Sequence, residues 1–201
     1  MIKLPGGARR IAVLTTAIAA VATALTWTLT ATSSAASPGP ATAKAAASVP
    51  RCYASDLGVW VPTNQTQGAA GTLLMPIEFT NLSQHTCALY GFPGVSAVSE
   101  PSSSGQQLGS PAVWEPSVKA TLVTLAPGAT GYASLAYSDV ITGNCPSAFK
   151  RTAAALRVYP PGETVPDYAY WSFPTCTAPG QTSFMRVRVI APGIGVLGDF
   201  G

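Results

Sequence analysis

Alternation of apolar and polar residues with a period of two is the feature that most constrains this chain. Between residues 57 and 61, Leu57, Val59 and Val61 alternate with Gly58 and Trp60. Four further segments share the pattern: 73–80, 132–137, 154–159 and 185–189. Successive side chains of a β-strand point to opposite faces, and Gly- and Pro-rich turns separate these runs. We therefore predict an all-β fold with little helix, an immunoglobulin-like antiparallel β-sandwich.

The alternation assigns faces to the strands, and two local features depart from a regular strand. In the last run, Met185, Val187 and Val189 share one face, and arginines 186 and 188 share the other. Pro76 has no N–H for a sheet ladder, so we expect the strand 73–80 to be an edge strand or to carry a bulge. The adjacent apolar pair at 122–123 predicts another bulge.

The N-terminal segment reads as an export signal. Basic residues (Lys3, Arg9, Arg10) precede the apolar run Ile11–Leu29, and small residues follow, so we predict a signal peptide over 1–36 with cleavage after Ala36. At about nineteen residues the run is also long enough to span a bilayer, so an uncleaved signal anchor is the alternative. After cleavage we expect a secreted or extracellular product, loosely associated with the cell surface and without stable membrane insertion.

The remaining chain divides by composition. Residues 37–50 are almost entirely Ala, Ser, Pro, Thr and Gly and are expected to form a flexible linker. Residues 51–191 contain all four cysteines and are expected to form one β-domain. The Gly-rich tail 192–201 is expected either to add a last strand or to stay free.

Four cysteines in an exported chain predict two disulfides. The set is Cys52, Cys87, Cys145 and Cys176, which allows three pairings. We favour Cys52 with Cys87 and Cys145 with Cys176, because each bridge then closes a local loop around one group of predicted strands. A cysteine metal site is disfavoured, because the cysteines are widely spread and no CxxC occurs.

The charge balance argues against a nucleic-acid partner. The three basic residues of the signal account for the whole formal excess of +3, so the mature chain has eight basic and eight acidic residues, scattered along it. Phosphate binding needs a concentrated basic footprint, which is not seen.

Several motifs occur in an order that resembles a known family. They are Arg51-Cys52 with Asp56-Leu57, Phe79-Thr80-Asn81, the segment Cys87–Val95 (CALYGFPGV), Leu125–Gly128 (LAPG) and Leu156–Gly162 (LRVYPPG). On these residues the chain resembles the exported bacterial family of domain of unknown function 4232, over about residues 51–189. The resemblance implies a β-sandwich module behind a signal peptide. It brings no activity and no catalytic residues.

Residues for catalysis or metal binding are scarce. His85 is the only histidine, so any Ser/His/Asp arrangement must use it, yet it lies in a polar turn beside Cys87. A histidine-rich metal site is impossible, and the acids nearest turns (Asp139, Glu163, Asp167) lack the dense spacing of a calcium loop. We expect no enzyme activity, no catalytic residues, no metal and no cofactor. The alternative is a secreted hydrolase that uses carboxylates, because sequence does not show which acids are close.

Aromatic residues are the best candidates for ligand binding. We single out Trp60, Tyr168, Tyr170 and Trp171, with Trp114 as a further candidate. The residues 168–171 are expected in an irregular segment before Cys176, where loops commonly carry recognition. The alternative is that these rings cover the core and pack on the disulfides.

The sequence therefore predicts a non-catalytic binding or structural module at or beyond the cell surface, with a cell-envelope glycan or protein as its partner. Arg186 and Arg188 are candidates for contact with an acidic partner, or else protect a strand from pairing with other chains.

Overall fold

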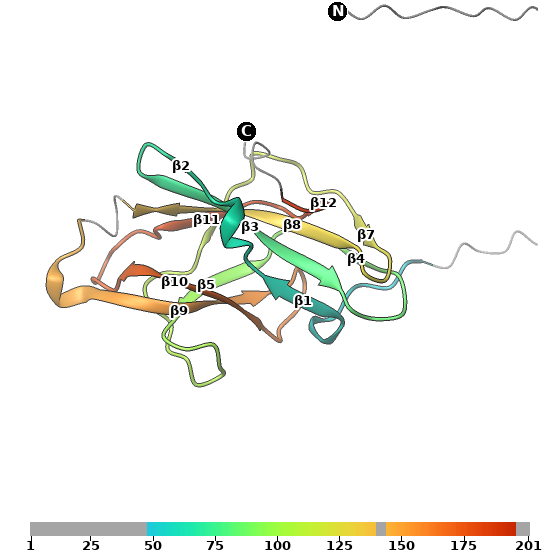
Figure 1. Cartoon of the computed structure of the whole chain (residues 1–201), viewed down its shortest axis with the longest axis horizontal. Helices are drawn as coiled ribbons and strands as arrows, with labels where there is room; N and C mark the ends of the chain where they lie inside the picture. Colours follow the sequence, from blue (N-terminus) through green and yellow to red (C-terminus); the bar gives the residue numbers. More distant parts are fainter. Residues whose placement is uncertain (1–47, 140–143, 196–201) are drawn as a thin grey trace, which may run out of the picture. The chain divides into compact units, whose positions relative to one another are not determined.

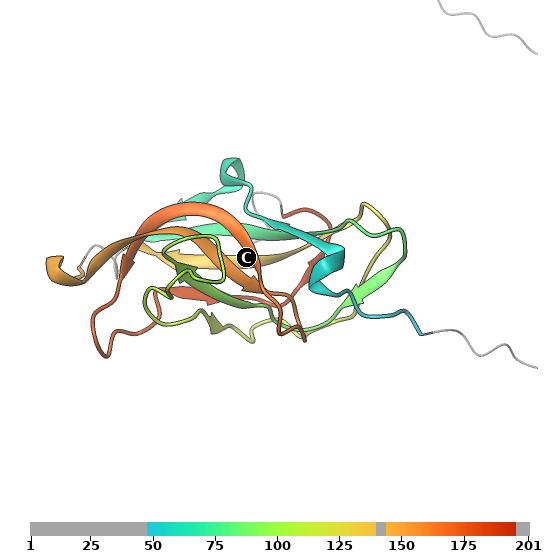
Figure 2. The same cartoon turned by 90° about the horizontal axis from the view of Figure 1, so that it is seen from below.

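The computed structural model describes residues 48–139 and 144–195. The predicted signal peptide and its cleavage site, most of the linker, and tail residues 196–201 lie outside this part of the chain. Two directions of view are given in Figures 1 and 2.

The largest sheet has seven strands, in the order β1–β3–β8–β11–β6, with β2 on β3 and β12 on β8 (Figure 1). Their bounds are β1 Leu57–Trp60, β2 Gln67–Ala69, β3 Thr72–Asn81, β6 Val113–Trp114, β8 Thr130–Ser138, β11 Met185–Val187 and β12 Ala191–Pro192. All of these pairs are antiparallel except β11 with β6, which is parallel.

A second sheet has three antiparallel strands in the order β10–β9–β5, and a separate ladder joins β4 to β7. The bounds are β4 Cys87–Leu89, β5 Gly94–Val98, β7 Val123–Leu125, β9 Lys150–Tyr159 and β10 Asp167–Cys176. Three short 3-10 helices complete the described elements: η1 Ala54–Asp56, η2 Thr63–Gln65 and η3 Ser147–Phe149. For residues 48–139 and 144–195, the prediction of an all-β fold with little helix is confirmed.

One hydrophobic core lies between the seven-stranded and the three-stranded sheet. Met75, Ile77 and Phe79 of β3 are fully buried in it, together with Leu156 and Val158 of β9. On the last strand, arginines 186 and 188 point away from the buried face formed by residues 185, 187 and 189. The faces predicted from the period of two are therefore confirmed, because an apolar residue at every second position can be removed from water only by facing the other sheet.

The expectation that Pro76 marks an edge or bulged strand is wrong. β3 lies inside the large sheet and pairs continuously with β8 over residues 72–80. On its other side, β2 pairs with residues 72–74 and β1 with residues 78–81, so residues 75–77 have no ladder partner there. A proline fits inside this strand because the neighbouring strand is interrupted next to it.

Two other local predictions, a bulge at 122–123 and an irregular segment at 168–171, differ from the structure. Leu122 lies just before β7 and is exposed, so no bulge forms at 122–123 and the strand simply starts at Val123. Residues 168–171 belong to the ten-residue strand β10, not to an irregular segment, and the register shift lies here, between Tyr170 and Phe173. The extra residues at this bulge obscure the period of two in the sequence.

The start of the tail is packed against the large sheet. Ala191–Pro192 form β12 on β8, and Gly193 N–H donates to the Thr130 carbonyl at 3.0 Å. A Cβ built on Gly195 would lie 2.3 Å from the Pro76 Cβ, so only glycine fits at this close approach. These residues cover part of the outer face of the sheet.

Both favoured disulfides are present. Cys52 is bonded to Cys87 and Cys145 to Cys176, and the described residues hold no free cysteine. Paired cysteines of this kind are typical of an oxidising, extracellular-type compartment. No helix in the described ranges is long and apolar enough to cross a membrane.

Candidate functional site

All four predicted ligand-binding aromatics keep some contact with solvent, and three of them do so on an outer sheet face. Tyr170 is 74% exposed on β10, and Tyr168, two residues earlier on the same outer face, is half-buried. Trp60 is 49% exposed at the end of β1, opposite the buried face of Leu57 and Val59. Each of these positions is fixed by a strand, because alternate residues of β1 and β10 are held in the core.

Trp171, by contrast, is partly buried and packs against the core. It sits in the β10 bulge, where its ring stacks on Phe173 with centroids 3.8 Å apart and meets Tyr137 edge-on at 5.4 Å. The Tyr137 hydroxyl donates to the Pro174 carbonyl at 2.9 Å, which fixes this cluster further. The surroundings of Trp171 therefore match the alternative prediction, in which the ring covers the core, better than they match a binding role.

The four predicted aromatics do not form one platform. The edges of the two sheets do meet, because Val59 N–H donates to Asp167 Oδ2 at 3.2 Å. However, Trp60 leaves the outer face of the seven-stranded sheet, whereas Tyr168 and Tyr170 leave the outer face of the three-stranded sheet. Any ligand would therefore meet Trp60 and Tyr170 separately.

A stacked pair that the sequence did not reveal is formed by Phe92 and Trp114. The ring centroids are 5.2 Å apart and the planes are 13° from parallel. Trp114 Nε1–H donates to the Pro93 carbonyl at 3.2 Å, while 58% of the residue stays exposed. The indole is thus held in place by a stack and a hydrogen bond, and it still presents surface to solvent.

The loop that carries Phe92 is shaped by its glycines and by neighbouring backbone. Gly91 has φ +103°, which a residue with a Cβ adopts at a cost, and it redirects the chain from β4 towards β5. Its carbonyl accepts a hydrogen bond from Ile190 N–H at 3.0 Å. Ala112 N–H donates to the Val95 carbonyl at 2.8 Å and so brings β6 to this loop. The motif Cys87–Val95 is therefore the support of the aromatic pair.

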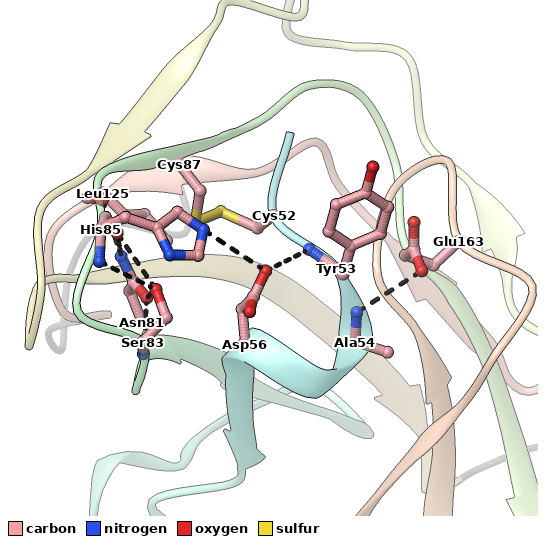
Figure 3. The surroundings of a disulfide bond; sticks show 10 residues. All are labelled: Cys52, Tyr53, Ala54, Asp56, Asn81, Ser83, His85, Cys87, Leu125 and Glu163. Carbon is pink, nitrogen blue, oxygen red and sulfur yellow. Dashed lines mark hydrogen bonds and ion pairs between the residues drawn. A yellow bond between two sulfur atoms is a disulfide. The ribbon is translucent and has the colours of Figure 1, made fainter. Parts of the chain in front are cut away.

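His85 lies beside the first disulfide, in a polar cluster shown in Figure 3. Its Nε2 is 3.8 Å from Asp56 Oδ2, and the same carboxylate oxygen accepts a hydrogen bond from Tyr53 N–H at 3.0 Å. The His85 side chain is 54% exposed and that of Asp56 is 15% exposed. The pair links the turn before Cys87 to η1, next to the bridge with Cys52.

Asn81 organises the turn that carries His85. It is fully buried, and its Nδ2 donates to the carbonyls of His85 at 2.8 Å and Leu125 at 2.9 Å. Its Oδ1 accepts from Ser83 N–H at 2.9 Å, and the Ser83 hydroxyl lies 2.7 Å from the same oxygen. The contacts of the hydroxyl with His85 involve the His85 backbone and not its imidazole, so Ser83 is held as a turn residue.

Two of the three acids expected near turns, Glu163 and Asp167, take part in structural contacts. Glu163 forms an ion pair with Arg51 at 2.9 Å, and its other oxygen lies 3.4 Å from the Ala54 N–H (Figure 3 shows the latter). Asp167 accepts from its neighbour Tyr168 N–H at 2.7 Å as well as from β1. In the ranges that the structure describes, no three of the residue types His, Cys, Asp and Glu gather in a way that could hold a metal ion.

Glu78 is a buried carboxylic acid on the outer face of the large sheet. It is 1% exposed, and register places it between Trp60 of β1 and Tyr132 of β8. Burial raises the pKa of this carboxyl, and a backbone hydrogen bond with Gly195 lowers the pKa in part. Its Oε1 has no hydrogen-bond partner. The acid is thus shielded by two aromatic rings and the start of the tail.

Fold and site together define an all-β, disulfide-bonded domain with exposed aromatic rings on a rigid framework. The sequence profile of the family described as domain of unknown function DUF4232 matches residues 52–190. The chain belongs to this family, as the motifs from Arg51 to Gly162 suggested. No curated protein gives a significant match to the chain.

Proposed function

We propose that this protein is an exported, non-catalytic binding module at or beyond the cell surface, and that the Phe92–Trp114 pair is its main contact with a cell-envelope glycan. The observation that carries the proposal is a tryptophan that is 58% exposed although a stack and a hydrogen bond fix its ring. Tryptophan is enriched at interaction surfaces, where it supplies a large contact area.

Preorganisation favours binding at this pair. A side chain that is already immobilised loses little conformational entropy when a ligand arrives, so more of the contact energy becomes affinity. One face of the indole is covered by Phe92, and a flat ring with a free face suits the apolar face of a sugar. Tyr90, two residues before Phe92, is 61% exposed and is a further candidate contact.

For the scaffold we propose an immunoglobulin-like β-sandwich. Two sheets that share one core and an antiparallel majority of strand pairs support this assignment. The alternative of a carboxylate-dependent hydrolase is disfavoured by Glu78, because an acid that is 1% exposed cannot reach a substrate without movement of the chain above it. The acids Glu163 and Asp167 are already engaged by backbone and arginine groups.

The proposal is tested by capture of isolated cell-envelope polysaccharide. Trp114→Ala is expected to weaken capture by about 30-fold or more, as for an interface hot spot of about 2 kcal/mol, and Phe92→Ala to weaken it less. Val165→Ala is the matched control, because Val165 is 60% exposed but aliphatic. The variants Trp60→Ala and Tyr170→Ala test the two other exposed rings.

Unchanged capture by Trp114→Ala would overturn the role of the pair. Capture of envelope protein but not of polysaccharide would overturn the glycan as partner. The stack itself is worth about 1 kcal/mol, so the melting temperature of each variant is measured alongside to separate lost binding from lost stability.

A further inference from the structure

A small hollow lies on the outer face of the seven-stranded sheet. None of its lining residues belongs to the Phe92–Trp114 pair. Its lining residues are Thr72, Ala136, Ser138, Ser183, Phe184 and Arg186. The register of the sheet explains this grouping, because Thr72 of β3 lies opposite Ser138 of β8, and Ala136 of β8 lies opposite Arg186 of β11. The small side chain of Ala136 leaves the space that the surrounding polar groups enclose.

Arg186 is the charged group of the hollow. Within the described ranges it has no ion-pair or hydrogen-bond partner, whereas Arg188, two residues later on the same side of the chain, pairs with Glu115 at 3.2 Å. Outward charges often protect an edge strand from pairing with other chains. That explanation does not apply to Arg186, because β11 is an interior strand between β8 and β6.

Hydroxyl groups supply the other donors. The Thr72 hydroxyl has no hydrogen-bond partner among the described residues, and it faces Ser138 across the β3–β8 pair. Ser183 is already engaged, because its hydroxyl donates to the Met185 carbonyl at 2.9 Å. The lining holds one positive charge and no acid. The arrangement therefore offers donors and a positive charge to a bound group, which must be an anion that accepts hydrogen bonds.

We propose that this hollow binds a carboxylate group. Its volume of about 30 Å³ is about twice what one water molecule requires, which matches the two oxygens of a carboxylate. Arginine and carboxylate are complementary in shape, since the guanidinium fork can donate to both oxygens. Phosphate has four oxygens and a larger charge, and it fits this space less well. The proposal concerns a second site and does not depend on the aromatic pair.

The test is an NMR titration of the disulfide-bonded protein with sodium acetate at low ionic strength, where screening of exposed charges is weak. Saturable shifts of the Ser138 and Arg186 amide signals are expected. The neutral analogue acetamide and an equal concentration of sodium chloride should not produce these shifts. Arg186→Gln should weaken acetate binding by about tenfold or more, as expected for a lost charge-assisted hydrogen bond.

Arg188→Gln is the matched control, because it removes an equal charge from the same face without changing the lining. Its acetate affinity should stay within about twofold of wild type, because the Arg188 guanidinium is paired with Glu115 and does not line the hollow. Equal shifts with acetate and chloride, or unchanged affinity in Arg186→Gln, would overturn the site. Tighter binding of inorganic phosphate than of acetate would overturn the carboxylate assignment.

The source of the carboxylate is distinguished by two further ligand pairs. A tripeptide with a free C-terminal carboxylate is compared with its amide, and glucuronate with its methyl ester. Preference for the free tripeptide would indicate a peptide terminus, and preference for glucuronate would indicate a sugar acid. If the amide and the ester bind as well as their acids, the carboxylate is not what the hollow recognises.

Discussion

Replacing Glu78 by glutamine should stabilise the protein at neutral pH and have little effect in acid. The side chain is 1% exposed, and its Oε1 has no hydrogen-bond partner. Ionisation leaves a negative charge in this site, beside Trp60 and Tyr132, where the backbone of Gly195 supplies one hydrogen bond. Glutamine has nearly the same shape and keeps an oxygen that can accept the hydrogen bond from the Gly195 backbone.

The sign of the effect follows from linkage. Burial raises the pKa of Glu78 in the folded state above the value of about 4.3 that an unfolded chain shows. Below that unfolded value the carboxyl is neutral in both states and contributes no pH dependence. As the pH rises above it, the unfolded chain ionises more readily than the folded one, so the free energy of unfolding of the wild type falls until the pH has passed the raised pKa.

The size of the effect is set by the charge that ionisation leaves on a buried carboxyl. Leaving a buried polar group without full hydrogen bonding costs about 1 to 3 kcal/mol, and more when the group is charged. Because glutamine stays neutral, Glu78→Gln should gain about 1 to 3 kcal/mol at pH 7. For a domain of this size, each kcal/mol corresponds to about 3 °C in melting temperature. The assay is urea unfolding of wild type and variant between pH 4 and pH 8, with both disulfides intact.

Glu100→Gln serves as the control, because Glu100 is an exposed acid that accepts a hydrogen bond from Ser104 at 2.8 Å. Its substitution should change the free energy of unfolding by less than about 0.5 kcal/mol. The reasoning is refuted if the difference between wild type and Glu78→Gln is the same at pH 4 and pH 7, or if the variant is the less stable protein at pH 7.

Three further predictions concern stability. Asn81→Ala should lower the free energy of unfolding by about 1 to 3 kcal/mol, because it removes the side-chain donor of the buried Leu125 carbonyl and the acceptor of the Ser83 N–H; a loss below about 0.5 kcal/mol in urea unfolding would contradict this. Gly195→Ala should cost about 1 to 3 kcal/mol, because the new Cβ would collide with Pro76; an unchanged melting temperature would show that the contact is not maintained in solution. Replacing Cys145 and Cys176 together by alanine opens a loop with a sequence separation of 31 and should cost about 4 kcal/mol by calorimetry; a loss below about 1 kcal/mol would contradict the chain-entropy account.

The sequence predicted the buried faces because they are local properties. The residues 133, 135 and 137 of β8 all face the core, as their spacing requires. The disulfide pairing was also accessible, because each bridge joins cysteines with a short separation of 35 or 31 residues. The family motifs were recognised for the same reason, since they are continuous in the chain.

Features that depend on contacts between distant segments were missed or wrong. Pro76 is tolerated inside a sheet because β1 and β2 end on either side of it, and nothing near Pro76 in the sequence encodes that gap. The Phe92–Trp114 stack joins residues 22 positions apart through a loop and a two-residue strand. Trp171 was singled out because residues 168–171 were predicted to lie in an irregular segment before Cys176, whereas they belong to β10, whose bulge turns the Trp171 ring towards Tyr137 and Phe173.

The central claim is that fixed, exposed aromatic rings, above all the Phe92–Trp114 pair, bind an envelope glycan on a framework that stays folded without them. The most direct measurement is the glycan affinity of a variant in which Trp60, Trp114 and Tyr170 are all alanine, read together with its melting temperature. The account predicts that glycan binding is lost while cooperative unfolding and both disulfides are retained. Binding at wild-type affinity in this folded variant would contradict it.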